Sequence, residues 1–171
     1  MNRILNLTTV LILAISCSSQ PSVDNDITKV NQRVLSTIQN DNYEAFKDII
    51  SKRTNPIIND YLLSERFFKA QKLLTDFPNS SNYRLKISTG KMSAESVFGE
   101  VEYTQVITIL DSVKFREDTF QTSIEFKFTQ EPGRQKILAL NIMDGRELIV
   151  LQRHLKNLQE GKECKSDCPF H

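Results

Sequence analysis

Apolar residues in the first half of the chain recur at intervals of three and four, the period of an amphipathic helix. They predict a first helix from Asp24, on a face formed by Ile27, Val30, Val34 and Ile38. Three further helical segments are expected near Tyr43, over 57–63, and over 65–76 with Ser64 as its cap. Pro78 ends the last of them, because the residue before a proline is biased away from helix. The first half of the chain is therefore predicted to be helical.

After position 79 the apolar period changes to two, which is typical of half-buried β-strands. Strands are expected over residues 83–88, 97–110, 120–129 and 135–143. In the second strand, the odd-numbered residues from Val101 to Ile109 are predicted to face the core, Tyr103 and Gln105 among them. In the third strand, the even-numbered residues from Thr122 to Phe128 are predicted to face the core. Such strands indicate an antiparallel sheet with one buried face.

The pair Asp144-Gly145 has two interpretations. Asp-Gly between apolar runs is a strong hairpin signal, so residues 146–151 could form a fifth strand. Asp144 and Glu147 also have the spacing of a capping box, and a leucine stripe at helical spacing follows: Leu148, Leu151, Leu155 and Leu158. We favour a final helix that ends near Gly161, with strand 146–152 as the alternative.

Helices followed by a run of strands predict an α+β domain over residues 24–160, with the helices packed on one face of a curved antiparallel sheet of about four strands. A C-terminal helix completes it. The opening helix, the segment 40–46 and the long strands resemble the cystatin-like NTF2 superfamily. That resemblance implies a cone between sheet and helices, where enzymes of the superfamily place an Asp or His.

The charge balance excludes one class of partner. The chain of 171 residues has 22 Lys+Arg against 21 Asp+Glu, a formal net charge of +1. Nucleic-acid binders are strongly basic, so we expect no nucleic-acid partner. An apolar fraction of 39% is enough for a hydrophobic core.

The pattern of the N-terminal residues is typical of an export signal. Arg3 precedes an apolar stretch over 7–15 that is too short to span a bilayer, which needs about 20 apolar residues. Ala14-Ile15-Ser16-Cys17 resembles the lipobox of bacterial lipoproteins. The resemblance implies that residues 1–16 are removed, that Cys17 is lipidated, and that 17–23 form a flexible tether. Ser18 resembles the signal for sorting to the outer membrane, so we expect a membrane-anchored protein of the cell envelope that faces the periplasm.

No catalytic constellation is visible. None of the predicted core-facing positions in the second and third strands is charged, and His154 is the one histidine in the predicted domain. Tyr103, Gln105, Thr122 and Phe126 are candidates for lining a ligand pocket. Neighbouring backbone groups could instead satisfy the polar ones, the interpretation we favour. We expect no enzyme activity and no cofactor.

The tail over 161–171 contains Cys164 and Cys168, which an oxidising envelope would join in a disulfide. With His171 they also offer three metal ligands, and Cys-x-x-x-Cys-Pro resembles the copper-binding motif of Sco-type copper chaperones. Two functions follow. The first is a non-enzymatic envelope protein that binds a small ligand or a protein partner. The alternative is an envelope metal or redox accessory protein that acts through Cys164, Cys168 and His171.

Overall fold

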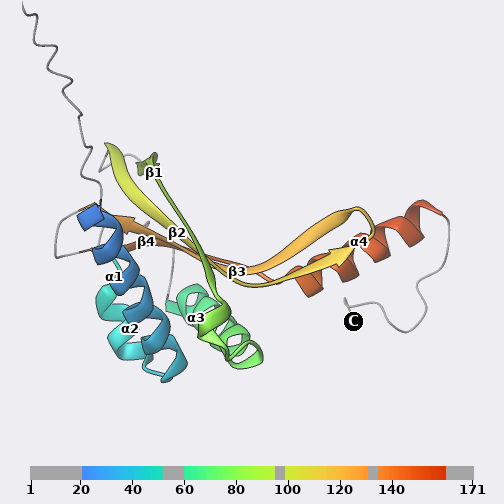
Figure 1. Cartoon of the computed structure of the whole chain (residues 1–171), viewed down its shortest axis with the longest axis horizontal. Coiled ribbons are helices and arrows are strands. Elements are labelled where there is room, and N and C mark those ends of the chain that lie inside the picture. The colour runs from blue at the N-terminus through green and yellow to red at the C-terminus, as the bar shows by residue number, and fades with distance from the viewer. Residues whose placement is uncertain (1–20, 52–59, 95–98, 131–134, 161–171) are drawn as a thin grey trace, which may run out of the picture.

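Three helices cover one face of a four-stranded antiparallel sheet in the computed structural model (Figure 1). The structure describes residues 21–51, 60–94, 99–130 and 135–160. The helices are α1 (Pro21–Gln39), α2 (Tyr43–Ile49) and α3 (Asp60–Asp76), and the sheet order is β1-β2-β3-β4. The strands are β1 (Arg84–Ala94), β2 (Gly99–Phe115), β3 (Asp118–Thr129) and β4 (Ile137–Met143), with a 3-10 turn, η1 (Ser80–Asn82), before them. Helix α4 (Gly145–Gln159) follows the sheet, so the predicted α+β class with a C-terminal helix is confirmed. Within the described residues, no helix has the length and apolar character needed to cross a bilayer.

Two helix boundaries differ from the prediction. Helix α1 begins at Pro21, so residues 21–23, which were predicted to be tether, are helical; proline is well suited to a first helical turn. The two segments predicted on either side of Ser64 form one continuous helix, α3. Ser64 does not cap it, because its hydroxyl donates to the carbonyl of Tyr61 inside the helix at 2.8 Å.

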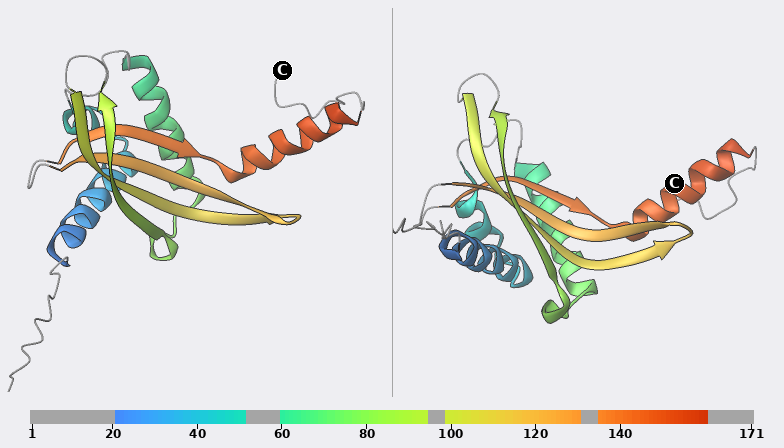
Figure 2. Two further views of the ribbon diagram at one scale, coloured as in Figure 1. Left: turned by 90° about the horizontal axis from the view of Figure 1, so that it is seen from above. Right: turned by 45° about the horizontal axis from the view of Figure 1, so that its top comes forward.

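The hairpin of β2 and β3 is longer than predicted. The strands pair as far as Phe115 and Asp118, which leaves only Arg116 and Glu117 as the turn. Arg116 has a φ of 58°, a left-handed conformation that is uncommon for a residue with a side chain. The hairpin therefore extends well beyond the helices, as Figure 2 shows.

Pairing between strands defines which residues share a face of the sheet. In an antiparallel pair, directly opposed residues lie on the same face. Thr104, Val106 and Thr108 of β2 oppose Phe128, Phe126 and Ile124 of β3, all of them buried. The helices pack on this face. The phase predicted for the middle of β2 is therefore wrong: Tyr103, Gln105 and Ile107 lie on the opposite, open face. Val101 and Ile109, at the two ends of the predicted series, are buried.

The core lies between the helices and this face of the sheet. Its largest fully buried side chains are Phe46, Phe67, Phe126, Phe128, Ile38, Leu73, Leu74, Ile124 and Ile137. Helices α2 and α3 meet through Tyr43, Phe46 and Phe67, with ring centroids 5.2 Å apart in each pair with Phe67. One polar residue from α1, Asn31, is buried in the same layer.

Helix α4 begins where β4 ends, and the helical interpretation of 145–159 is confirmed. The Asp144 side chain accepts a hydrogen bond from the backbone N–H of Arg146 at 2.9 Å, which caps the helix. Gly145 allows the helix to start against β3, because a Cβ there would lie 3.1 Å from backbone atoms of Phe120 and Gln121. The Glu147 carboxylate pairs with Lys69 of α3 at 2.7 Å.

Candidate functional site

A groove of about 450 Å³ opens between α1, the 3-10 turn η1, and strands β1 and β2. Its lining comes from elements far apart in sequence: Asn31, Gln32, Leu35, Gln39, Ser80, Ser81, Tyr83, Leu85 and Thr108. Helix α1 supplies four of these residues, and β1 supplies Leu85, which lies directly opposite Thr108 of β2. The groove therefore lies between helices and sheet, in the region where ligand pockets of α+β domains form.

Asn31 is the central residue of the groove lining. Its side chain is 0% exposed, and its Nδ2 donates to Oγ1 of Thr108 at 3.0 Å. Its Oδ1 meets no hydrogen-bond partner, and it is the one buried side-chain polar atom without a partner in the part of the chain that the structure describes. Turning the amide by 180° would let the oxygen accept from the Thr108 hydroxyl but would leave the amide nitrogen unpaired. One end of the buried amide therefore stays unpaired in either orientation.

An unpaired buried amide group costs about 1–3 kcal/mol of stability. Such a group is uncommon in a native core, where buried polar atoms are nearly all hydrogen-bonded. Because Oδ1 is buried, side chains of the lining would have to move before a ligand in the groove could donate a hydrogen bond to it and offset this cost. The unpaired atom thus identifies the groove as the candidate binding site.

The groove lining has no charged side chain. Gln32, Gln39, Ser80 and Ser81 are exposed at its rim and offer amides and hydroxyls. Tyr83 donates its phenolic hydrogen to the carbonyl of Phe77, and partial burial raises the pKa of that hydroxyl. The lining can therefore form hydrogen bonds and apolar contacts, but it has no carboxylate or imidazole to transfer a proton.

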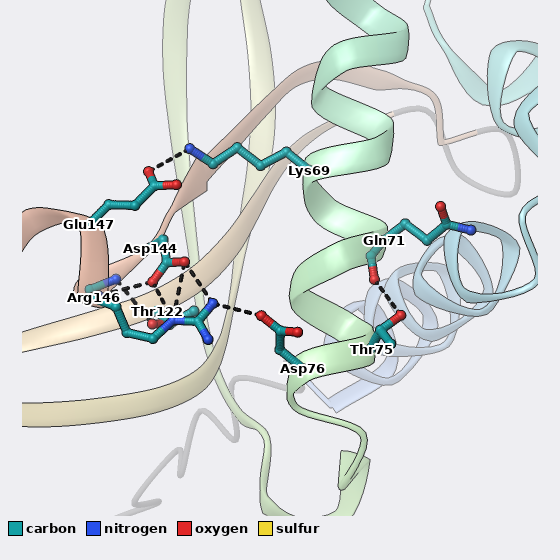
Figure 3. A network of polar contacts seen from close by, with 9 residues as sticks. Lys69, Gln71, Thr75, Asp76, Thr122, Asp144, Arg146 and Glu147 are labelled. Carbon is teal, nitrogen blue, oxygen red and sulfur yellow. Dashed lines mark hydrogen bonds and ion pairs between the residues drawn. The ribbon is translucent and has the colours of Figure 1, made fainter. Parts of the chain in front are cut away.

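A second polar cluster joins α3 to the start of α4 (Figure 3). The Arg146 guanidinium donates to both oxygens of Asp144, at 2.8 to 3.3 Å, and to Asp76 Oδ2 at 2.9 Å. Arg146 also lies over the ring of Phe77, 5.0 Å from its centroid. These bonds hold the pKa of the buried Asp144 carboxyl below its ordinary value.

This cluster positions α4 and has little capacity left for a ligand. The backbone N–H of Gly145 donates to the hydroxyl of Thr122 at 3.0 Å, and Lys69 pairs with Glu147 on the other side. Arg146 is shared between two carboxylates, and Asp144 also caps the helix. We therefore assign the cluster to the attachment of α4.

The structure does not bring the four predicted pocket residues together. Thr122 and Phe126 lie on the helix-covered face, whereas Tyr103 and Gln105 lie on the open face. The Thr122 hydroxyl accepts the Gly145 N–H, which matches the interpretation that a backbone group satisfies it. Phe126 is fully buried in the core. None of the four lines the groove at Asn31.

Tyr103 and Gln105 have neighbours of their own on the open face. The Tyr103 ring lies over Gly90 of β1, where an added Cβ would come within 2.7 Å of the hydroxyl oxygen. Nζ of Lys127 is 4.7 Å from the centroid of that ring. Gln105 accepts a hydrogen bond from the Ser88 hydroxyl at 3.0 Å. These contacts stabilise the sheet.

The remaining predicted site residues, Cys17, Cys164, Cys168 and His171, lie outside the described residues. Within the described ranges, no group of three or more His, Cys, Asp or Glu side chains could hold a metal ion. His154 is half-buried on α4.

The sequence analysis missed Asn31, although a signal for it exists. The buried residues of α1 are Ile27, Asn31, Val34, Leu35 and Ile38, so successive buried positions are four, three, one and three residues apart. Asn31 is the second residue of this series. A polar residue in line with Ile27, Val34, Leu35 and Ile38 is a residue that the core must accommodate. Its partner Thr108 could not be found this way, because the phase of β2 was predicted wrongly.

Comparisons of the chain with protein-family models, with curated proteins and with solved structures gave no match.

Proposed function

We propose that this protein is a lipid-anchored, non-enzymatic binding module of the bacterial cell envelope, with Asn31 at the centre of its ligand site. The observation that carries the proposal is the unpaired Oδ1 of Asn31 beside a groove of about 450 Å³. A pocket of that size accommodates a small molecule.

The lining indicates the chemical class of the ligand. An unpaired carbonyl oxygen requires a hydrogen-bond donor, and the amides and hydroxyls at the rim can both donate and accept. Leu35 and Leu85 provide apolar contact, and an uncharged lining offers no counter-ion to an ionic ligand. A neutral, hydroxyl-bearing molecule such as a saccharide fits these requirements.

The location belongs to the same proposal. Cys17 after a short apolar signal is the proposed lipid anchor, most simply in the outer membrane facing the periplasm. Two or three acyl chains on one cysteine hold a protein stably at a bilayer. The likeness to the NTF2-like superfamily stays a prediction, supported by the order of helices and strands.

The test is a ligand titration followed by NMR. Neutral mono- and disaccharides, with inorganic phosphate and a small carboxylate as charged comparisons, are added to the chain from Ser18 to His171. We expect a neutral saccharide to shift the backbone amide signals of the groove residues Leu35, Tyr83 and Thr108. Asn31→Leu should abolish these shifts, whereas Asn141→Leu, on the exposed surface of β4, should leave them intact. Equal shifts in all three proteins would refute the assignment.

A further inference from the structure

Helix α4 exposes a stripe of leucines that nothing in the described chain covers. Leu151, Leu155 and Leu158 are 37%, 50% and 55% exposed, and Leu148 is half-buried beside them. Val150, next to the stripe, is 39% exposed. Scattered exposed leucines are ordinary on a protein surface, but a contiguous row of them indicates an interaction site.

The opposite side of α4 faces the β2–β3 hairpin. Gln152 donates to Asp118 at the hairpin turn at 3.4 Å, and the Arg153 guanidinium lies 5.6 Å from the centroid of the Phe115 ring. The helix is thus attached to the protein through polar and aromatic contacts, with its leucines directed away. Figures 1 and 2 show α4 extending away from helices α1 to α3.

The spacing of the stripe suits a second copy of the same helix. The four leucines are separated by three, four and three positions, the a/d spacing of a coiled-coil seam. This spacing is the same in both directions along the helix. We propose that α4 forms an antiparallel pair with α4 of a second copy, in which Leu148 packs on the partner's Leu158 and Leu151 on the partner's Leu155.

Additional surface comes from the groove between α3 and α4. This groove has a volume of about 620 Å³ and is lined by Lys72, Asp76, Asp144, Arg146, Glu147, Leu148, Val150 and Leu151. It adjoins Leu148 and Leu151, the two leucines on which the C-terminal half of the partner's α4 packs. A seam of three helical turns alone would bury less than the roughly 1,200 Å² of a stable interface, so the groove enlarges the contact. We expect a reversible dimer.

The narrow stripe favours a helix over a bilayer as the occupant. Helices that lie in a membrane surface have a broad apolar face, aromatic anchors and many Lys or Arg residues. The stripe of α4 has no aromatic residue and is flanked by Glu147, His154 and Gln159. In the antiparallel arrangement Glu147 lies opposite the partner's Gln159, so the flanks bring no like charges together.

Sedimentation velocity over a wide range of protein concentration tests the proposal, using the chain from Ser18 to His171, which contains every described element. We expect a concentration-dependent dimer. Leu155→Lys with Leu158→Lys should weaken dimerisation at least about tenfold, because the lysines remove apolar contact and place charges against the partner's Leu151 and Leu148. Gln159→Lys is the control: it adds the same charge opposite the partner's Glu147 and should not weaken dimerisation. All substituted positions are exposed, and equal thermal unfolding would show that the fold is intact.

Cysteine cross-linking tests the direction of the pair, in a background of Cys164→Ser and Cys168→Ser. A mixture of Leu151→Cys and Leu155→Cys chains should form more disulfide-linked dimer than either chain alone. A monomer at every concentration, or a dimer that the lysine substitutions leave unchanged, would overturn the proposal. Lysine-sensitive binding to phosphatidylglycerol vesicles by a monomeric protein would instead identify a bilayer as the occupant.

Discussion

The side-chain amide of Asn31 on α1 donates to the hydroxyl of Thr108 on β2 at 3.0 Å, across 77 positions of sequence. The two residues connect the helical layer to the sheet, and both are fully buried. The amide can make more hydrogen bonds than this one, and its oxygen makes none. The pair therefore combines a structural contact with an unpaired polar atom beside a groove.

The first prediction concerns the stability cost of that pair. The double variant Asn31→Leu, Thr108→Val removes the buried polar groups together and retains their volume approximately. We expect a free energy of unfolding equal to that of the wild type or about 1–2 kcal/mol higher, because the unpaired oxygen is gone. Asn31→Ala should lower the free energy of unfolding by about 2 kcal/mol, because it leaves a cavity and removes the hydrogen bond to Thr108. Urea unfolding measures both; a large loss of stability in the double variant would mean that the pair is required for folding.

The second prediction concerns the attachment of α4. Asp144→Ala removes a helix cap and a carboxylate that Arg146 binds, so we expect a loss of about 2 kcal/mol at neutral pH. Thermal or urea unfolding provides the measurement. Glu160→Ala, at the far end of α4, is a suitable control and should change stability little.

A pH dependence follows from the same carboxyl. Arg146 lowers the pKa of Asp144 in the folded state below its ordinary value of 3.8. The resulting stabilisation is fully present above the unfolded-state pKa and is lost as the pH falls through the folded-state pKa. Asp144→Asn should therefore reduce the difference in unfolding free energy between about pH 7 and pH 3. An unchanged difference would show that Asp144 does not contribute to acid sensitivity.

The third prediction tests the placement of Tyr103 on the open face. Gly90→Ala places a Cβ against the Tyr103 ring, which must move away from Lys127. We expect a loss of about 1 kcal/mol, reduced to near zero in a Tyr103→Ala background. A double-mutant cycle of unfolding free energies measures this coupling. Independent effects of the two substitutions would contradict the contact.

The fourth prediction concerns the lipid anchor. Cys17→Ser should abolish incorporation of labelled palmitate and release the protein from the membrane fraction, because the thiol that carries the lipid is missing. Cys164→Ser is the matched control and should leave both unchanged. If Cys17→Ser leaves the protein membrane-bound and cut at the same position, the lipoprotein assignment is wrong.

The sequence predicted the fold class and the order of elements because the helical and strand periods are clear in most segments. In β3, Gln121, Ser123, Glu125 and Lys127 alternate with apolar residues, and its phase was predicted correctly. In β2, the run Val106-Ile107-Thr108-Ile109-Leu110 is mostly apolar on both faces, so a period of two does not define the buried side. A shift of register between Ile109 and Asp111 then changes the phase within the strand.

The candidate site could not be predicted from the sequence because it depends on contacts between distant elements. Asn31 could have been recognised as a polar residue in an apolar stripe, but only the packing of α1 on β2 places it beside Thr108. The leucine stripe of α4 predicted a helix correctly, but periodicity alone does not show which surface covers it. Tertiary packing determines both the position of Asn31 beside Thr108 and the surroundings of the leucine stripe.

The most direct test of the proposed function is the saccharide titration of the wild type and of Asn31→Leu, followed through the side-chain amide signals of Asn31 and the backbone signals of the groove. We predict that a neutral saccharide shifts the signals of Asn31, Leu35, Tyr83 and Thr108 in the wild type and shifts none of the groove signals in Asn31→Leu. Binding that shifts signals elsewhere, or that survives Asn31→Leu, would contradict the account.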